Sequence, residues 1–480
     1  MNFASILYIL GTLVEVEGAL FIAPALVALF YREPEGLVYL FFALVCAIAG
    51  RLTTFRKVKQ QIYYAKEGFV SVALGWIIMS VVGCIPFMLT GEIPGFTDAL
   101  FETVSGFTTT GSSILSNVEG LSHCSLFWRS FTHWIGGMGV FVFILAILPK
   151  TGAQNMHLLR SESPGPEVGK LVPKIGDSAK ILYVIYFGMT VIQIIILLIT
   201  RMPLFDAVTL TFGTAGTGGF GIKNSSIADY TYVQQLIIGI FMLLFGVNFN
   251  FYFFILIRHS LREAVNMDEV KTYFAIVAAS TVLIMLNARS MFGNMADAFG
   301  KAFFQVSSII TTTGFSTADF NEWPAFSKTI LVCLMFTGAC AGSTGGGFKI
   351  SRLIIMAKAY VRELIHFIHP RLVKNIYMDK RKVKNETVSG VMVYLASYVL
   401  VFLVSLLVIS TDGFDPETNF TAVMATLNNI GPGLSTVGPA GNFDHYSDIS
   451  KFVLTFDMLA GRLELYPMLL LFSPGTWRKR

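Results

Sequence analysis

Apolar segments long enough to cross a lipid bilayer recur along almost the whole chain. A membrane-spanning helix takes about 20 mostly apolar residues. Hydrophobic residues make up 54% of the 480 residues and charged residues only 14%, about half the charged share of a soluble domain. This composition excludes a soluble multidomain enzyme and predicts an all-α integral membrane protein. We predict spans at 4–31, 36–50, 68–90, 127–148, 181–200, 233–257, 272–288, 327–368, 387–410 and 450–473.

Basic residues gather in the loops on one side of these spans. An excess of Lys and Arg is typical of cytoplasmic loops, so we predict a multi-pass topology with a cytoplasmic N-terminus. Acidic residues, among them Asp98 and Glu102, gather on the opposite side and predict an outer mouth that attracts cations. Most of the 35 Lys and Arg residues lie in five segments, 51–66, 149–180, 258–271, 349–384 and 478–480.

Four half-apolar stretches, each too short to cross a bilayer, lie between the spans. Each ends in a run of small residues that contains a glycine. Four copies of span, half-helix, glycine turn and span make an internal repeat. The stretches are 97–110, 203–217, 297–313 and 418–430, and the glycines that close them are Gly111, Gly219, Gly314 and Gly431.

The chemistry expected of this repeat comes from the backbone. A half-helix that ends inside a membrane leaves its last carbonyl groups unpaired, and such backbone is tolerated only where it is buried or lines a cavity. Extended residues before a glycine can direct their carbonyl oxygens at one axis and replace the water around a cation. One such run could equally serve helix packing. Four at similar spacing predict a cation filter within a single chain.

A second glycine-rich run, residues 338–347, interrupts the long apolar stretch 327–368. Each glycine weakens a helix by about 1 kcal/mol relative to alanine, so we predict a hinge or intramembrane loop here, called the glycine loop below. Two alternatives remain open: close helix packing, and a phosphate-binding loop, although the required Gly-Lys-Ser/Thr ending is missing. The residues concerned are Gly338, Gly342, Ser343, Thr344, Gly345, Gly346 and Gly347.

Arg462 lies inside the last apolar span. An arginine at mid-membrane costs roughly 2.5–3.5 kcal/mol or more and usually faces a cavity or a partner. We interpret it as a positive barrier beneath the filter that is coupled to the glycine loop. The alternatives are a structural ion pair with Glu464 or Asp457, and a side chain that reaches toward the membrane surface.

Motifs throughout the chain resemble the Trk/Ktr/HKT superfamily of K⁺ transporters, and most closely its TrkH/TrkG branch of bacterial potassium-uptake subunits. The resemblance covers nearly the whole chain. It rests on the four glycine runs and on the segments Trp134–Gly139, Ser163–Pro166, Gly338–Gly347, Leu427–Gly433 and Met458–Glu464.

The resemblance implies two N-terminal helices followed by four M1–P-loop–M2 repeats in pseudo-fourfold symmetry around one pore. The implied units are 1–66, 67–150, 151–258, 259–372 and 373–480. It also implies that backbone carbonyls bind K⁺ at Thr110, Gly111, Gly218, Gly219, Thr313, Gly314, Ile430 and Gly431. Thr109, Thr217, Thr312 and Asn429 belong to the wider filter, and the glycine loop with Arg462 forms the gate.

The same resemblance implies location in the bacterial inner membrane, a homodimer, and a cytosolic regulatory ring of the TrkA/KtrA kind. The chain itself is expected to hold no cofactor besides the transported K⁺, and a nucleotide (ATP/ADP or NAD(H)) is expected on the regulatory partner. The basic stretch 371–384 is interpreted as a membrane anchor, with anionic lipid or a partner protein as alternatives. No nucleic-acid partner is expected, because the basic residues are dispersed.

Three other functions are alternatives to a K⁺ channel. A symporter coupled to Na⁺ or H⁺ remains open. A carrier with inverted repeats would need two halves of opposite orientation, whereas these four units enter from the same side. An intramembrane hydrolase would need a nucleophile and a base at membrane depth, and no such pair stands out: His366 and His369 lie three residues apart near a basic helix end, and the other five histidines, His133 among them, are scattered. We therefore expect a transporter rather than an enzyme.

Overall fold

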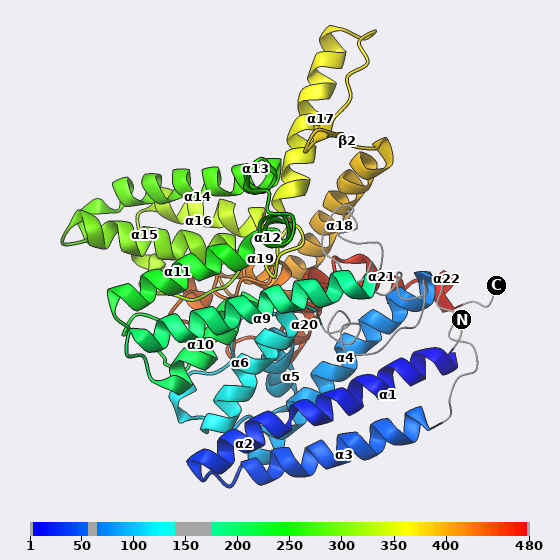
Figure 1. The fold of residues 1–480 in the computed structure, drawn as a ribbon, viewed down its shortest axis with the longest axis vertical. Helices are drawn as coiled ribbons and strands as arrows, with labels where there is room; N and C mark the ends of the chain where they lie inside the picture. The colour runs from blue at the N-terminus through cyan, green and yellow to red at the C-terminus, as the bar shows by residue number, and fades with distance from the viewer. Residues whose placement is uncertain (1–2, 56–64, 140–174, 478–480) are drawn as a thin grey trace.

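A computed structural model describes residues 3–55, 65–139 and 175–477 (Figure 1). Within these ranges the chain is mostly helical, with connecting segments between the helices and one two-stranded hairpin of β1 (Tyr377–Met378) and β2 (Arg381–Lys382). The predicted motif at 163–166 and the end of the predicted span 127–148 lie outside the described residues. The predicted all-α membrane fold is confirmed.

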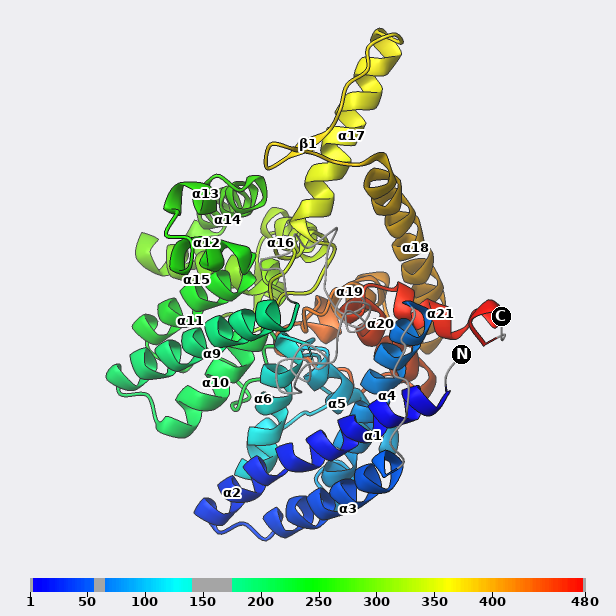
Figure 2. The ribbon, with the colours of Figure 1, turned by 45° about the vertical axis from the view of Figure 1, so that its right-hand side comes forward.

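Two membrane spans precede the repeats. The first combines α1 (Phe3–Leu20) and α2 (Ile22–Tyr31), and the second is α3 (Gly36–Thr54). α1 and α3 pack against each other along their length. In Figure 2 these helices lie outside the remaining bundle.

The rest of the chain repeats one order of helices four times: a long outer helix, a short pore helix and an inner helix. The pore helices begin and end close to the four predicted half-apolar stretches. The outer helices are α4 (Ala65–Thr90), α9 (Ile175–Ile199), α14 (Asp268–Asn287) and α18 (Asn385–Ile409). The pore helices are α5 (Phe96–Phe107), α10 (Leu204–Gly216), α15 (Met295–Ile310) and α19 (Pro416–Leu427). The inner helices begin with α6 (His123–Gly137), α11 (Tyr232–Gly246), α16 (Ala325–Thr337) and α20 (Asp448–Arg462).

The four units close into a ring. Each inner helix packs against the pore helix of the next unit: α6 on α10, α11 on α15, α16 on α19, and α20 on α5. The last of these contacts joins the fourth unit back to the first. The C-terminal halves of the pore helices are buried at the centre of this ring, which gives the pseudo-fourfold arrangement expected from the sequence.

The inner helices are interrupted more often than predicted. The interruption within 327–368 is confirmed, because α16 ends at Thr337 and α17 (Ile350–Ile368) begins after the glycine loop. The predicted spans 233–257 and 450–473 are also interrupted. α11 meets α12 (Asn250–Leu256) at a bend of 95°, and α20 is separated from α21 (Tyr466–Leu471) by Glu464 and Leu465, both of which have positive φ. Apolar composition alone does not distinguish a straight helix from a broken one.

Short elements complete the described chain. α13 (Leu261–Val265) joins the second unit to the third, and α22 (Pro474–Trp477) is the last helix of the described residues. α17 and the β hairpin project away from the ring of helices (Figure 2).

Candidate ion pathway

The four pore helices end in the same hydrogen-bonding pattern. Two positions before each closing glycine, the backbone N–H donates a hydrogen bond to the carbonyl oxygen of the residue three positions earlier in the chain. The N–H of the next residue bonds five residues back, as in Thr110 N to Ser105 O (2.9 Å) and Ile430 N to Ala425 O (2.8 Å). This is the Schellman ending of a helix, which requires a left-handed residue. That residue is Thr109, Thr217, Thr312 or Asn429, with φ of 54°, 54°, 58° and 54°.

Threonine is an unusual choice for this position. Glycine and asparagine adopt positive φ easily, whereas a β-branched residue there is a true outlier. Such strain persists only where the surrounding structure imposes it, and it concentrates at functional sites. Three strained threonines, Thr109, Thr217 and Thr312, at equivalent places therefore mark the ends of the pore helices as a functional centre.

The closing glycines form a ring of close backbone contacts. Below, the filter segments are residues 109–111, 217–219, 312–314 and 429–431. Each closing glycine has positive φ, from 77° at Gly219 to 101° at Gly431. A Cβ built on Gly111 would lie 2.0 Å from Gly218 O, and one built on Gly219 would lie 2.0 Å from Thr313 O. A Cβ built on Gly314 would lie 2.2 Å from Ile430 O, and one built on Gly431 would lie 2.9 Å from Thr110 O.

Each glycine thus faces the carbonyl that precedes the next glycine, in the order of units one, two, three, four and one. Only glycine fits this position, both because of its φ and because of the neighbouring oxygen. The four filter segments converge on one small region lined by backbone oxygens. Carbonyl oxygens in such a ring can replace the hydration shell of a cation.

The loops that leave the filter segments on the outer side are joined in the same cyclic order. Hydrogen bonds link neighbouring units and hold the ring closed without relying on the filter segments themselves. They run from Val118 N to Asn224 Oδ1 (2.8 Å), Ile227 N to Ser316 O (3.0 Å), Ser435 N to Asn321 Oδ1 (2.8 Å), and Phe443 N to Ser113 O (2.9 Å).

Side chains behind the filter segments differ between the units. In units one and three, two threonine hydroxyls pair: Thr108 with Thr110 and Thr311 with Thr313, each at 2.8 Å. In unit four the Asn429 amide donates to Thr110 Oγ1 at 2.9 Å and to Met458 O at 2.9 Å. The backbone arrangement is therefore fourfold, whereas its support is specific to each unit.

The electrostatics favour a cation at this centre. The first turns of three of the pore helices, at the outer side, carry Asp206, Asp297 and Glu417. The C-terminal ends, with their partial negative charge, meet at the filter segments. Asp415, which caps α19, accepts hydrogen bonds from the Thr418 side chain and N–H, and these lower the pKa of its carboxyl group. It therefore stays ionised at neutral pH.

The acidic mouth is smaller than the sequence predicts. Glu102 is 1% exposed and pairs with Arg129, which is 2% exposed, at 2.7 Å. Asp98 pairs with Lys451 at 2.6 Å. Both carboxylates face basic groups supplied by inner helices, so they are structural groups rather than free charges in the mouth.

The glycine loop lies directly beneath two of the pore helices. A Cβ at Gly345 would lie 2.9 Å from Thr311 O, and one at Gly346 would lie 2.6 Å from Asn428 O. The N–H of Gly346 donates to Thr312 Oγ1 at 2.6 Å. The loop therefore touches the filter segments of units three and four from below, which fits the predicted gate position.

Glu269, which the sequence analysis missed, holds the glycine loop from α14. Its carboxylate accepts hydrogen bonds from Ala341 N (2.7 Å), Ser351 N (3.0 Å) and the Asn248 amide (3.2 Å). It is only 2% exposed. Acidic residues are common in the first turn of a helix, so nothing in the sequence distinguishes Glu269 from an ordinary residue at a helix start.

Basic groups also surround the loop. Lys349, at the end of the loop, is buried and donates to Gly345 O. Arg352 pairs with Glu464 and stacks on Tyr394, with its guanidinium carbon 3.9 Å from the ring centroid. These residues were also missed as part of the site, although Lys349 lies only two residues after the glycine run.

Arg462 connects the glycine loop to the first unit. Its guanidinium donates to Thr344 O at 2.8 Å, to Gly137 O at 2.7 Å and to Gly136 O. The alternative of an ion pair with Glu464 or Asp457 is wrong: Glu464 pairs with Arg352, and Asp457 accepts from Ser405 at 2.7 Å. The predicted link between Arg462 and the loop is present as a direct hydrogen bond.

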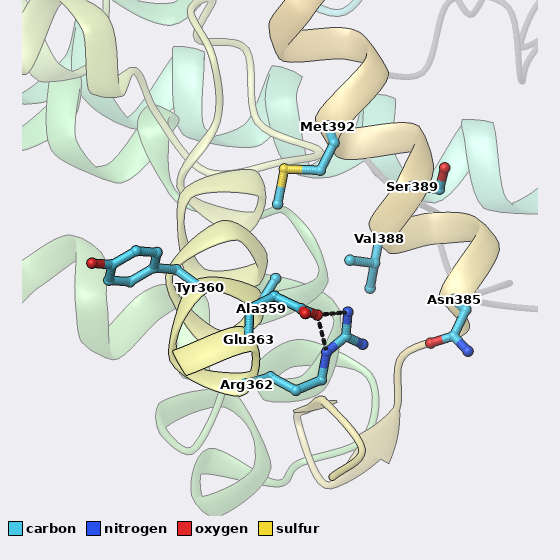
Figure 3. A pocket seen from close by; sticks show the side chains of 8 residues that line it. All are labelled: Ala359, Tyr360, Arg362, Glu363, Asn385, Val388, Ser389 and Met392. Atoms are coloured by element: carbon cyan, nitrogen blue, oxygen red, sulfur yellow. Dashed lines mark hydrogen bonds and ion pairs between the residues drawn. The ribbon is translucent and has the colours of Figure 1, made fainter. Parts of the chain in front are cut away.

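Two larger hollows lie away from this centre. One, of about 460 Å³, lies between α17 and α18, where Arg362 pairs with Glu363 at 2.9 Å (Figure 3). The other, of about 550 Å³, is an apolar hollow formed by α11, α14 and α15. Neither includes a residue of the filter segments or the glycine loop. Among the described residues, no group of three or more His, Cys, Asp or Glu side chains that could hold a metal ion is found.

Comparisons with known proteins find matches over nearly the whole chain. A family model for TrkH, described as a cation transport protein, matches residues 37–478. The chain is 37% identical over 487 residues to the Trk system potassium uptake protein TrkH of Salmonella typhimurium, covering all of both chains. It is 33% identical to TrkG of Escherichia coli over 98% of this chain and 97% of that one. The crystal structure of the potassium transporter TrkH from Vibrio parahaemolyticus superposes with a TM-score of 0.89, at 33% identity and full coverage of both chains.

Proposed function

Because the chain belongs to the TrkH family of cation transport proteins, we propose that it takes up K⁺ through a single-chain pore. It is a multi-pass membrane transporter and not an enzyme, which sets the intramembrane hydrolase aside. One observation carries the proposal. The four closing glycines each face the carbonyl before the next glycine, and together they complete a ring.

In this proposal K⁺ loses water to the carbonyl oxygens of the filter segments. The oxygens belong to the residues before the glycines and to the glycines themselves, with Thr109, Thr217, Thr312 and Asn429 completing the wider filter. The ring is built from backbone held by Schellman endings, so its oxygens are positioned before the ion arrives. The pore-helix C-termini add negative potential and disfavour anions.

The glycine loop and Arg462 form the proposed gate. The loop occupies the space beneath the filter segments of units three and four, and Arg462 ties it to the end of α6. Opening would require the loop to leave Thr312 and Arg462 together. A positive side chain beneath the filter would also slow cations while the loop is in place.

We place the protein in the bacterial inner membrane with a cytoplasmic N-terminus, as a homodimer controlled by a cytosolic regulatory ring of the TrkA/KtrA kind. Relatives are named as parts of a Trk system, which supports a multi-component assembly. α17 and the residues after it project from the ring and expose Phe367, Ile368 and Val373, a surface suited to a protein partner. A nucleotide would bind to that partner rather than to this chain.

Purified protein in liposomes tests the function. With a K⁺ gradient as the sole driving force, uptake of radiolabelled Rb⁺ that K⁺ inhibits more strongly than Na⁺ supports the K⁺ pore. Uptake that requires an imposed Na⁺ or H⁺ gradient would replace the pore by a symporter. Absence of Rb⁺ uptake under both conditions would reject K⁺ transport by this chain alone.

A further inference from the structure

The second filter segment lacks the side chains that support the first and third. Units one and three place threonine before the closing glycine, and its hydroxyl pairs with a second threonine two residues earlier, as in Thr108 and Thr110. Unit two has glycine at both of these places, Gly216 and Gly218. Two glycines next to a filter should loosen it, because glycine contributes no packing and the most backbone freedom.

A histidine from the neighbouring unit fills that space. A Cβ built at Gly218 would lie 2.3 Å from Cγ and 2.4 Å from Nδ1 of His133 on α6, and one built at Gly216 would lie 2.2 Å from the His133 carbonyl oxygen. The His133 side chain is fully buried. The two glycines and the histidine are therefore steric complements, although they belong to different units.

The same face of α6 also holds the outer end of this filter segment. The His133 ring stacks on Phe220 with centroids 4.2 Å apart. One turn earlier on α6, the Arg129 guanidinium lies 4.0 Å from the Phe220 ring centroid and donates to Gly221 O at 3.2 Å. Arg129 is fixed in turn by Glu102 of α5. His133 and Arg129 therefore contact the second filter segment on both sides of Gly219, His133 at Gly218 and Arg129 at Gly221.

We infer that His133 is a positioning residue for ion selectivity, whose imidazole does for the second filter segment what Thr110 and Thr313 do for the first and third. The inference rests on the proposed function. It explains why unit two reads Gly-Thr-Gly-Gly where units one and three read Thr-Thr-Thr-Gly: the absent threonine side chains are replaced by a ring from unit one. The asymmetry of the sequence is thus compensated in space.

A four-member series tests the pairing: wild type, His133→Ala, Gly218→Thr and His133→Ala/Gly218→Thr. Each is reconstituted in liposomes, and the preference for K⁺ over Na⁺ is measured from their competition with Rb⁺ uptake. Each single change should lower the preference by about tenfold, the size of coupling expected between groups that share one space. The double variant should recover to within about threefold of wild type, because the threonine side chain then occupies the space left by the ring.

His445→Ala, at an exposed outer position, is the matched control and should leave the preference unchanged. His133→Asn, which keeps a polar side chain of smaller volume, serves as a second single variant should the alanine variant fail to assemble. A preference unchanged in the His133 variants, or a double variant as poor as the worse single one, would overturn the inference. Failure of the wild type to take up Rb⁺ would instead reject the proposed function.

Discussion

The ring of filter segments has a fourfold backbone, whereas the layer directly beneath it differs from unit to unit. In the filter ring four segments with three different sequences adopt one backbone conformation, with the same helix endings and the same sequence of positive φ values. Beneath it, the four inner helices end in four different ways: α6 near Gly137, a 95° bend after α11, the glycine loop after α16, and a short break after α20. Symmetry is kept where an ion would be held and abandoned where its passage would be controlled.

This difference indicates what each layer depends on. The filter ring is made of backbone, so a side chain matters there chiefly by its absence or by its packing behind the ring. The lower layer is held by individual side chains, Glu269, Lys349 and Arg462 among them. Substitutions in the ring should therefore lower the preference for K⁺ and the rate of uptake, whereas substitutions below it should raise the flux.

The largest effect is expected from Gly219→Ala. Its Cβ would lie 2.0 Å from Thr313 O, and the position has φ of 77°, so the ring must open. We expect Rb⁺ uptake to fall by about a hundredfold, as for misplacement of reacting groups by about 1 Å. Gly91→Ala is the matched control, since Gly91 has φ of 78° and nothing within 4 Å. Equal losses in both variants would mean that backbone strain rather than the ring contact is responsible.

Arg462→Ala should have the next largest effect, in the opposite direction. The change removes the hydrogen bonds to Thr344 O and Gly137 O together with a positive charge beneath the filter. Flux in liposomes should rise by about tenfold, as expected for loss of a charged hydrogen bond, with the preference for K⁺ retained. Arg289→Ala, in the outer loop before α15, is the control. Unchanged flux with an intact preference would contradict the gate assigned to Arg462.

Glu269→Ala tests the other anchor of the glycine loop. It leaves Ala341 N, Ser351 N and the Asn248 amide without their acceptor, which should loosen the loop and raise flux by about fivefold. Glu263→Ala, at an exposed site on α13, should behave as wild type. A fall in flux, with the protein still folded by size-exclusion chromatography, would show that Glu269 holds the pathway open instead.

The smallest expected effect distinguishes two equivalent residues of the filter ring. Thr312 accepts a hydrogen bond from Gly346 N in the glycine loop, whereas the hydroxyl of Thr109 has no hydrogen-bond partner among the described residues. Thr312→Val should raise flux by about two- to threefold through loss of one neutral hydrogen bond, and Thr109→Val should not. The same response from both would break the contrast between the symmetric ring and the asymmetric layer below it.

The sequence predicted the upper layer better than the lower one. The pore helices and their glycines were recognisable because the unit recurs four times, and the interruption of 327–368 because five glycines fall within ten residues. The bend after α11 was missed because the segment around Asn248 is as apolar as a continuous span. The contacts of Glu269 and Arg352, and the role of His133 behind Gly218, depend on residues that lie far apart in the chain.

Arg462 illustrates the same limit within a single residue. Its position inside an apolar span was enough to predict a functional role and a link to the glycine loop. Its nearest acidic neighbours in sequence suggested an ion pair, yet backbone carbonyls of Gly137 and Thr344 are its partners. Carbonyl groups at the ends of broken helices leave no trace in composition, so such partners become visible only once the helix ends are known.

Since all four units belong to one polypeptide, a substitution alters a quarter of the ring rather than the whole of it. A pore assembled from four identical subunits would carry every change four times, and a mildly unfavourable residue would become a severe one. In a single chain each unit can change separately, so that one unit can be specialised for ion binding and another for gating. Such separate change of the four units accounts for the different residues that lie behind the four glycines.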